Sequence, residues 1–382
     1  MQALAGLKVV DLTHALAGSF CTYHLGLVGA EILKIEPPRK GDEFRDWRPP
    51  TFAAANAGKR SMTLDLKSPE GKNILMRLLE TADVLTENFR PGVAAKLGLD
   101  WDKLKVLNPR LIYCSISGFG QTGKFRDYPA MEWSVQAIAG ITDTYISPDE
   151  DPRRLGISLL DPFSGYMGFA SILTAVLQRE KTGVGQRIDV GMLDAAWVLN
   201  ATSVVDMMMG DRPVSATLRA TAARFRAKDR SIYISVIWPK WFEATCDILG
   251  APELLADPRF ADEKARNNSG EVLVREFESR LAAQNAAYWE EKLIARGVPA
   301  GVVRTIPEVA AEEDMNARGL LNDVVLESGQ TVKVVGAGFK FEHDGPRLQG
   351  GVPGLGEANK VTLKGLGFSD EQIAALAAKG VI

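Results

Sequence analysis

The sequence predicts an α/β protein, because apolar runs typical of buried strands alternate with stretches of helical spacing. Residues 7–12 (LKVVDL) form a nearly continuous apolar run, which is typical of a strand buried on both faces of a parallel sheet. Residues 19–28 have the spacing of a helix that ends at Gly29, and residues 31–35 (EILKI) are typical of a second strand. Strand, helix and strand in this order predict a βαβ unit, from which parallel sheets are built.

The same alternation continues along the first half of the chain. Residues 62–66 (MTLDL) and 83–85 predict strands, with an amphipathic helix between them at residues 72–81. Residues 108–120 predict a turn, a strand and a glycine-bearing loop, and residues 186–190 predict a further strand. Ligands of such sheets bind beyond the carboxyl ends of the strands. No GxGxxG motif follows the first strand, which argues against a dinucleotide site.

A long helix is predicted at Asp161. Residues 155–160 are short, apolar and capable of forming a strand, and apolar residues then recur at helical spacing as far as Leu177. Asp161 followed by Pro162 is typical of an N-cap and a first helical position. Gly183 ends the predicted helix.

The second half of the chain predicts a smaller α/β domain and a return to the first domain. We place the large domain at residues 1–205, the small domain at 225–325 and the C-terminal return at 330–382. The predicted elements are strands at residues 230–237, 298–303 and 329–334, and helices at residues 240–249, 277–294, 307–315 and 368–376.

Composition and charge narrow the classes of function. The chain has 382 residues, of which 46% are hydrophobic and 24% charged, as in soluble globular proteins long enough for two domains. A formal net charge of −3 gives no whole-chain signal for nucleic acid or for a membrane surface. The N-terminus lacks the pattern of a signal peptide, and no stretch reaches the ~18 apolar residues of a transmembrane helix. We therefore expect a cytoplasmic protein.

Cysteine and histidine predict neither a disulfide framework nor a metal site. The three cysteines are widely spaced, and the three histidines form no HxxxH or similar pair. We expect the cysteines to be free and buried as small hydrophobic residues, and we expect no metal ion. The residues concerned are Cys21, Cys114, Cys246, His14, His24 and His343.

Two interpretations of Asp161 compete. As an N-cap it contributes about 1 kcal/mol to helix stability, and N-cap aspartates are common. As a catalytic carboxylate it is held ionised by the N–H groups and the dipole of the helix, and it is available as a nucleophile, since carboxylates form covalent acyl intermediates. The local pattern permits the second interpretation without requiring it.

Several longer motifs resemble those of the class III CoA-transferases, the CaiB/BaiF family to which formyl-CoA transferase belongs. They begin with DLTHALAGSF and GAEILKIEPPRKGDEFRDW near the N-terminus and continue with NAGKRSMTLDLK, ENFRPG and NPRLIYCSISGFG. They also include the run around Asp161 and the ending LGFSDEQIAALAAKGVI. The resemblance extends from about residue 5 to residue 382.

The resemblance implies a fold, an assembly and a site. The implied fold is a Rossmann-like large domain formed by both chain ends plus a smaller α/β domain, and the implied assembly is an interlocked homodimer. The implied catalytic residue is Asp161, with no metal. The residues that the resemblance places in substrate and CoA binding are Leu16, Ala17, Gly18, Lys59, Arg60, Leu64, Lys67, Asn88, Phe89, Lys96 and Glu132.

Within this set the resemblance suggests particular roles. Lys59, Arg60 and Lys67 are candidates for the phosphates of CoA, because cations beside a βα turn suit a polyanion, although a solvated basic edge has the same sequence. Asn88 and Phe89 are candidates for the adenine and pantetheine region, although Arg-Pro-Gly after them also predicts a plain turn.

Four positions depart from the family pattern, and one of them is Glu132, which stands where the transferases commonly carry aspartate. Leu16 stands where formyl-CoA transferase carries a catalytic glutamine, which argues against formate or oxalate chemistry in particular. Ser19 replaces the usual proline. Met131 stands where the racemase branch carries the histidine of its acid/base pair, and a thioether cannot move a proton.

The implied activity is that of an acyl-CoA:carboxylate CoA-transferase, which works through an aspartyl–acyl anhydride and an aspartyl–CoA thioester on Asp161. CoA is then substrate and product, and no cofactor is bound permanently. Two alternatives are an isomerase or racemase of the same family and a non-catalytic CoA-binding homologue. Backbone N–H groups near Ala17 and Gly18, or in the small domain, are candidate donors to the oxyanions of the reaction.

Overall fold

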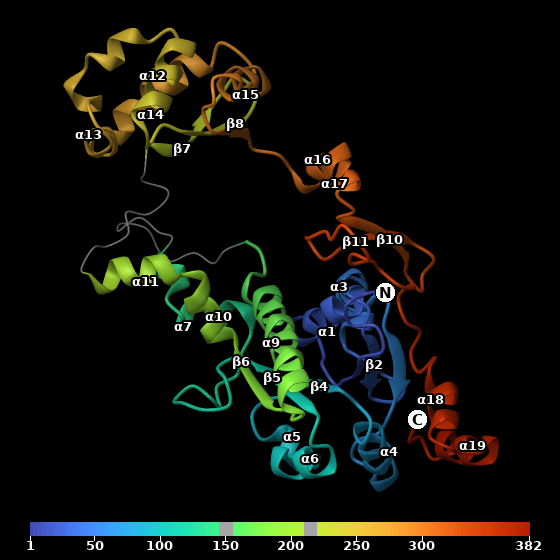
Figure 1. Cartoon of the computed structure of the whole chain (residues 1–382). Coiled ribbons are helices and arrows are strands. Elements are labelled where there is room, and N and C mark those ends of the chain that lie inside the picture. The colour runs from blue at the N-terminus through green and yellow to red at the C-terminus, as the bar shows by residue number, and fades with distance from the viewer. Residues whose placement is uncertain (145–155, 210–219) are drawn as a thin grey trace. The chain divides into compact units, whose positions relative to one another are not determined.

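The computed structural model describes residues 1–144, 156–209 and 220–382, and the chain divides into two compact units (Figure 1). The candidate site lies in unit 1. Unit 1 combines Met1–Ala139, Leu155–Leu199 and Glu313–Ile382, and unit 2 consists of Gly140–Arg154 and Asn200–Glu312.

Unit 1 contains a six-stranded parallel sheet in the order β3-β2-β1-β4-β5-β6. This is the strand order of a Rossmann fold, in which the order reverses between the two central strands and ligands bind at that point. The predicted α/β class with a Rossmann-like sheet is therefore confirmed. The strands are β1 (Lys8–Asp11), β2 (Glu31–Glu36), β3 (Arg60–Thr63), β4 (Val84–Glu87), β5 (Ile112–Ser117) and β6 (Arg187–Gly191).

Side-chain alternation along β1 explains why its sequence is apolar throughout. Val9 lies in a core cluster with Leu25 and Ile172 on one face of the sheet, and Val10 lies in another with Ile74 and Leu79 on the opposite face. The two valines are 1% and 4% exposed, so each contributes on the order of 1.5–3 kcal/mol by leaving water.

Helices cover both faces of this sheet, and the first core cluster includes residues of α1 and α9 while the second includes residues of α4 and α6. Cys21 and Cys114 lie in the first cluster as free, buried thiols, as the sequence predicts. The helices of this part of the chain are α1 (Ala17–Leu27), α2 (Phe44–Trp47), α3 (Pro49–Asn56), α4 (Pro69–Leu79), α5 (Val93–Lys96), α6 (Trp101–Leu107), α7 (Glu132–Ile138), α9 (Leu160–Thr182) and α10 (Met192–Leu199).

Glycines in α9 let its neighbours come close. A Cβ at Gly165 would lie 2.4 Å from the carbonyl oxygen of Ala17, and one at Gly168 would lie 2.8 Å from the Cδ1 atom of Ile116. Alanine at Gly165 would force α9 away from α1, whereas alanine at Gly168 would require the end of the Ile116 side chain to move. By length and composition alone, α9 could cross a membrane. Core helices of soluble proteins meet the same test. In this structure α9 packs on α1 and β5.

The segment before α9 corrects one prediction. Residues 156–159 form bends and irregular backbone instead of the predicted strand, because α9 already begins at Leu160. Leu155, the first residue of that predicted strand, lies outside the described residues.

The C-terminal segment packs on the N-terminal part of the sheet. The N–H of Asp65 donates to the Val381 carbonyl at 2.8 Å, and the N–H of Ala358 donates to the Ser61 carbonyl at 2.8 Å. A capping box between Ser369 and Gln372 begins the last helix, as the sequence predicts. The elements of this segment are α17 (Glu313–Ala317), the hairpin β10 (Leu321–Val325) and β11 (Thr331–Val335), α18 (Asn359–Gly365) and α19 (Asp370–Ala378).

Unit 2 is built around a small antiparallel sheet in the order β7-β8-β9. Its core contains Phe225, Phe242 and Phe277, all of them buried. The strands are β7 (Ala222–Arg226), β8 (Ser231–Ser235) and β9 (Ala300–Val302). The helices are α8 (Ile141–Thr144), α11 (Ala201–Met208), α12 (Pro239–Ile248), α13 (Glu263–Asn268), α14 (Gly270–Leu281), α15 (Ala286–Ala295) and α16 (Ile306–Ala311), with 3₁₀ turns at Pro252–Leu255 and Pro258–Phe260.

Candidate active site

A cavity of about 310 Å³ lies at the carboxyl ends of the central strands of unit 1. Its walls come from the segments that follow β1 and β4, from the end of β5 and from the first residues of α7, α9 and α10. A Rossmann-like sheet binds its ligands at this edge. The lining includes Leu16, Ala17, Asn88, Phe89, Ser117, Met131, Glu132, Asp161 and Met192. Five residues that the resemblance placed in substrate binding therefore meet here with the predicted catalytic aspartate.

Asp161 is not the N-cap of α9, which corrects the prediction made from the Asp-Pro pair. The helix begins at Leu160, so Asp161 is its second residue and Pro162 its third. The Asp161 side chain lines the cavity, while its own N–H donates to a carboxylate of another helix. The cap interpretation is wrong because a different carboxylate accepts hydrogen bonds from the N–H groups at the start of this helix.

Glu132, the first residue of α7, supplies that acid. Its Oε1 atom accepts the N–H groups of Leu159 and Leu160, each at 3.0 Å, and its Oε2 atom accepts the N–H of Asp161 at 2.8 Å. Oε1 also accepts the side-chain amide of Gln136 at 2.7 Å. Helix N-termini present unpaired N–H groups and a positive dipole end, so a buried carboxylate is well placed there. Glu132 thus fixes the start of α9.

The environment of Asp161 disfavours its charge. Burial is the larger cause and the neighbouring Glu132 carboxylate the second, and together they raise the pKa of Asp161 from 3.8 to about 7. The expectation that the helix holds this carboxylate ionised is therefore wrong for the free protein. The N–H groups that would have favoured the anion are occupied by Glu132. A carboxylate with a pKa near neutrality is weakly solvated when ionised, and such groups occur at functional sites.

The turn after β1 brings Leu16 and Ala17 to Asp161. Leu16 lines the cavity, and Ala17 begins α1 at the point where Gly165, one helical turn after Asp161, lies against it. Gly18 follows, and a Cβ there would lie 2.4 Å from the Cγ2 atom of Thr13 and 3.1 Å from the Cβ atom of Asn88. Gly18 is therefore needed for packing of the turn and does not line the cavity.

Lys59 is a structural cation, which corrects its prediction as a phosphate ligand. Its ammonium is buried and donates to Asp11 Oδ2 at 3.0 Å, to the Ser19 carbonyl at 2.9 Å and to Asn56 Oδ1 at 2.8 Å. These three bonds use all three of its protons. Burial, as the largest cause, lowers the pKa of Lys59 to about 8, although the Asp11 carboxylate opposes this shift.

Asn88 and Phe89 reach the cavity, but the amide of Asn88 is already used. Its Oδ1 atom accepts the N–H of His14 and its Nδ2 atom donates to the His14 carbonyl, both at 2.8 Å. The amide therefore ties two loops together, and these two bonds leave one N–H and one lone pair of the amide for other partners. Phe89 is half-buried, and its N–H donates to Glu87 Oε2 at 2.7 Å.

The other predicted CoA ligands lie outside the cavity lining. Leu64 is buried in the core cluster below the sheet, so its side chain is a core residue and not a ligand contact. Arg60 is exposed at the start of β3, Lys67 is exposed before α4, and Lys96 is exposed at the end of α5. These three cations remain predictions for a ligand that extends beyond the cavity.

Sequence reasoning missed a set of cations around the cavity. Arg48, Arg90 and Arg126 are exposed and line it. Arg90 belongs to the ENFRPG motif, so its signal was present in the sequence. Arg48 and Arg126 stand in no recognised motif, and only the fold brings them here. Guanidinium groups at the mouth of an active-site cavity suit phosphates and carboxylates.

The cavity bears on the alternative of a racemase. Met131 is 66% exposed and lines the cavity, where it supplies no acid or base. None of the described residues that line the cavity is a histidine. His24 is buried, and its Nδ1 atom bonds to the Phe20 carbonyl. The histidine that the racemase branch uses as its second base is therefore not found among these lining residues.

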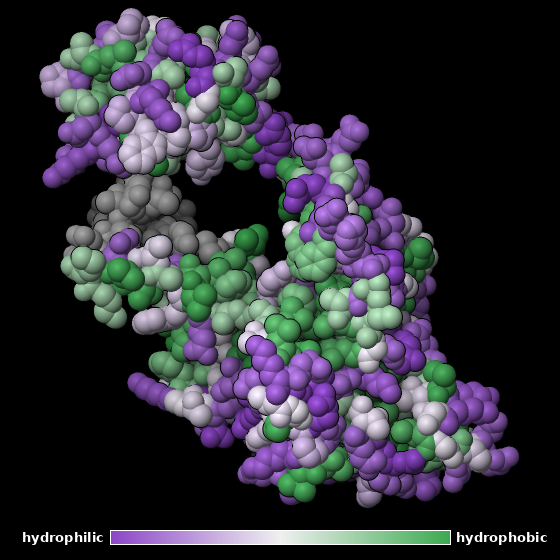
Figure 2. All heavy atoms as spheres, in the orientation of Figure 1, coloured by the Kyte–Doolittle hydropathy of each residue, from purple (hydrophilic) through white to green (hydrophobic). Residues whose placement is uncertain are grey.

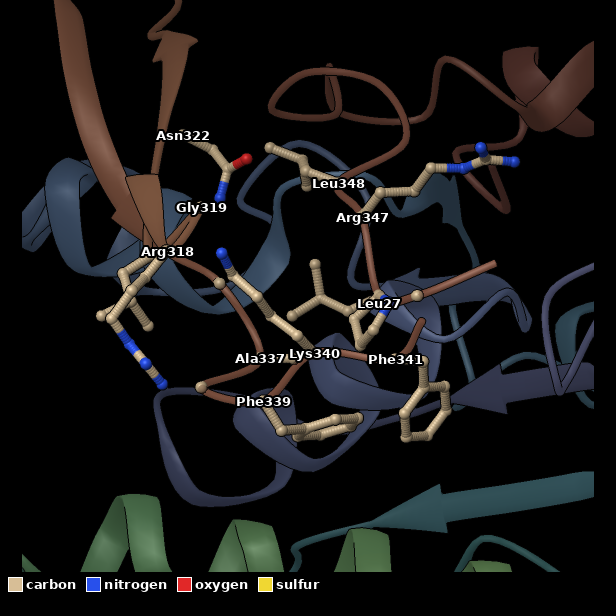
Figure 3. Close-up of a pocket in the computed structure, with 15 residues that line it drawn as sticks. Leu27, Arg318, Gly319, Asn322, Ala337, Phe339, Lys340, Phe341, Arg347 and Leu348 are labelled. Carbon is tan, nitrogen blue, oxygen red and sulfur yellow. The ribbon is translucent and has the colours of Figure 1, made fainter. Parts of the chain in front are cut away.

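A second cavity of about 210 Å³ lies between the end of α1 and the segment around β10 and β11. Figure 3 shows Asn322 and Lys340 pointing into it, with Arg318 and Arg347 at its sides. It contains none of the residues predicted for catalysis or CoA binding. The chemistry proposed below therefore concerns the first cavity.

Comparison with known proteins shows which family the chain resembles in sequence and structure. The model of a family described as CoA-transferase family III matches residues 4–359. The chain is 38% identical over 370 residues to the acetyl-CoA:oxalate CoA-transferase of Acetobacter aceti, which covers 92% of each chain. It is 33% identical over 379 residues to the succinate–glutarate CoA-transferase of Agrobacterium fabrum, which covers 93% of each chain. The crystal structure of a CaiB/BaiF family protein from Brucella suis matches with a TM-score of 0.86 and 32% identity, covering 96% of this chain and 99% of that one.

Proposed function

The chain belongs to CoA-transferase family III, and from this membership we propose that it moves CoA between carboxylic acids through covalent intermediates on Asp161. That the chain is an enzyme transferring CoA follows from the family. The covalent route rests on one observation, the placement of Asp161 in a cavity where Glu132 already caps its helix. The Asp161 carboxylate has no capping duty in the described structure and is available for chemistry.

The proposed reaction exchanges one activated carboxyl group for another. The Asp161 carboxylate attacks the thioester carbonyl of the donor, forms a carbon–oxygen bond and expels CoA thiolate, which leaves a mixed anhydride. The thiolate attacks the Asp161 carbonyl, releases the donor acid and forms an aspartyl–CoA thioester. The acceptor carboxylate then attacks that carbonyl and expels the thiolate. The thiolate finally takes the acceptor acyl group and restores the Asp161 carboxylate.

The raised pKa of Asp161 is compatible with this role. A carboxylate that is poorly stabilised as an anion is a more reactive nucleophile, and bound substrate further excludes water from it. Only the ionised form attacks, so the acylation rate should rise with pH through about 7. CoA enters as a substrate and leaves as a product.

The relatives suggest which acids to test first. The two named above act, by their names, on oxalate, succinate and glutarate, which are dicarboxylic acids. The arginines at the cavity suit a second carboxylate as well as the phosphates of CoA. We therefore propose short dicarboxylic acids as acceptors, with acetyl-CoA or succinyl-CoA as donor, and we place succinate and glutarate before oxalate because Leu16 argues against oxalate.

Transfer by the purified enzyme tests the proposal. Acetyl-CoA or succinyl-CoA is incubated with a panel of mono- and dicarboxylic acids, and new CoA esters are identified by mass spectrometry. We expect at least one dicarboxylic acid to be converted without ATP or added metal, because each step conserves an activated carboxyl group. Deuterium exchange at the α-carbon of a 2-methylacyl-CoA, without transfer to any acid, would instead indicate a racemase.

We also propose that the enzyme is a homodimer. Trp197, Val198 and Leu199 at the end of α10 are exposed, and Figure 2 shows hydrophobic side chains gathered over this part of unit 1. Contiguous exposed apolar residues are typical of protein interfaces. Light scattering at micromolar concentration should give about twice the 41.5 kDa chain mass. A monomer at that concentration would contradict the proposal.

A further inference from the structure

The turn between β1 and α1, residues 13–16, is held by side chains instead of by regular secondary structure. Ala15 and Leu16 line the cavity that contains Asp161, and Ala17 follows them as the first residue of α1. Consecutive backbone groups of this turn, from the Thr13 N–H to the Ala15 N–H, each bond to a side chain. Four side chains from separate segments make these bonds, and we call Asp11, Lys34, Asp42 and Asn88 the turn clamp.

The first part of the turn clamp holds Thr13. Asp11 Oδ1 accepts both the N–H of Thr13, at 2.9 Å, and its hydroxyl, at 2.5 Å. Lys34 Nζ donates to the Thr13 carbonyl at 2.6 Å. Both charged groups are fully buried. A buried charge that loses its partner is costly, so these contacts resist distortion of the turn.

The second part holds His14 and Ala15. Asn88 bonds to both the N–H and the carbonyl of His14, and the Asp42 carboxylate accepts the N–H of Ala15 at 3.2 Å. Asp42 is itself paired with Lys34 at 3.1 Å, so the two parts of the clamp are joined inside the protein. Asn88 lies in the loop after β4 and Lys34 lies on β2, and these two strands flank β1 on its two sides.

Ala15 shows that the turn is held away from its preferred backbone. Its φ of 58° lies in the left-handed region, which a residue with a Cβ adopts only when its surroundings impose it. Glycine would adopt the same φ without this cost. The clamp contacts on either side of Ala15 supply the constraint. Strain of this kind beside a cavity is a marker of a preorganised site.

We propose that the turn clamp positions Leu16 and the first turn of α1 against Asp161, so that Asn88 acts as a positioning residue through its two bonds to His14. The link to the reacting group is direct, because Gly165, one helical turn after Asp161, lies against the Ala17 carbonyl. A displaced turn would move Ala15 and Leu16, which line the same cavity as Asp161. This inference rests on the proposed function, since the turn borders the group that reacts there.

Asn88→Ala is the test variant and Asn108→Ala its matched control. Asn108 also donates its amide to two backbone carbonyls, those of Leu79 and Ala82, and accepts the N–H of Arg110, but it lies away from the cavity. We expect Asn88→Ala to lower kcat by about 10- to 100-fold with little change in KM for the acyl-CoA, because misplacement of about 1 Å has effects of this size. Asn108→Ala should keep kcat within about twofold, since its contacts do not reach the cavity.

A second substitution separates positioning from ligand binding. Adding Ala15→Gly to Asn88→Ala should recover part of kcat, because glycine adopts the left-handed φ at no steric cost and the remaining clamp contacts then suffice to hold the turn. A lost contact to CoA would not be restored by a glycine elsewhere. A raised KM with unchanged kcat in Asn88→Ala, or no recovery in the double variant, would overturn the proposal. If Asn88→Ala does not fold, Asn88→Asp, which retains the acceptor for His14 but loses the donor, takes its place.

Amide hydrogen exchange keeps this test independent of the proposed function. In the CoA-free protein, Asn88→Ala should speed exchange at the N–H groups of His14 and Ala15, and Asn108→Ala should leave them unchanged. Absence of CoA transfer in the wild type would refute the proposed function. The exchange measurement would still test whether the turn clamp holds the turn. Unchanged exchange in Asn88→Ala would refute the clamp even in an active enzyme.

Discussion

An Asp161→Asn variant is expected to lose CoA transfer, with kcat reduced by about 10³-fold or more, because a carboxamide cannot form the acyl intermediate. The variant should still bind acyl-CoA, since the cavity keeps its shape. Initial rates with the best donor and acceptor pair measure the loss. Asp100→Asn is the matched control, because Asp100 caps α6 through the N–H of Asp102 and lies outside the cavity, so transfer should be unchanged. An active Asp161→Asn enzyme, shown by mass to be free of deamidated product, would contradict the mechanism.

The same variant should be more stable than the wild type at pH 8 but not at pH 4. The pKa of Asp161 is higher in the folded protein than in the unfolded chain, so ionisation costs stability as the pH rises from about 4 through about 7. Asparagine does not ionise and avoids that cost, which is on the order of 4 kcal/mol at full ionisation. Thermal unfolding at the two pH values measures the difference. An equal change in stability at both pH values would mean that ionisation of Asp161 does not destabilise the folded protein.

Glu132→Gln is expected to destabilise the protein by about 2–4 kcal/mol, because a buried charged acceptor of helix N–H groups is lost. Glutamine has one acceptor oxygen, whereas both oxygens of Glu132 accept N–H groups at the start of α9. Its NH₂ group would then face the N–H of either Leu160 or Asp161. Denaturant unfolding measures the loss. Glu70→Gln is the control, because Glu70 lies in the first turn of α4 but is paired with Lys379 at the surface, where the effect should stay below about 0.5 kcal/mol.

Glu132→Gln should also move the pH dependence of catalysis. Loss of the neighbouring negative charge lowers the pKa of Asp161, so the rising limb of kcat/KM should shift to lower pH. The variant should have a lower maximal kcat/KM than the wild type, because the start of α9 is less well fixed. It should keep a larger fraction of that maximum at acid pH. A rising limb that stays in place would show that Glu132 does not act on the charge of Asp161.

Much of the fold could be predicted because the signals are local. The continuous apolar run at β1 reflects a strand covered on both faces, with Val9 and Val10 in opposite core clusters. The long helix α9 follows from apolar spacing and ends, as predicted, at Gly183 in a left-handed conformation. Asp161, Leu16 and Phe89 were placed in the site by motif, and all three line one cavity.

The errors have a common physical cause, which is that contacts between distant segments are invisible in a local pattern. The Asp-Pro pair predicts that Asp161 caps α9. Instead Glu132, 29 positions before Asp161, accepts hydrogen bonds from the N–H groups at the start of this helix. Lys59 looks like a phosphate ligand until its burial against Asp11 is seen. Asn88 looks like a ligand contact until both ends of its amide are found on His14. In each case tertiary contacts assign a polar side chain to the scaffold of the site.

Direct trapping at Asp161 tests the covalent mechanism. Wild-type enzyme is mixed with acyl-CoA without acceptor and quenched with hydroxylamine or borohydride, and the peptides are then sequenced by mass spectrometry. Hydroxylamine converts an activated aspartyl carbonyl to a hydroxamate, and borohydride reduces it to an alcohol. The proposed mechanism predicts modification at Asp161 that requires acyl-CoA and is absent in Asp161→Asn. An enzyme that transfers CoA yet shows no modification at Asp161, or is modified at another carboxylate, would contradict it.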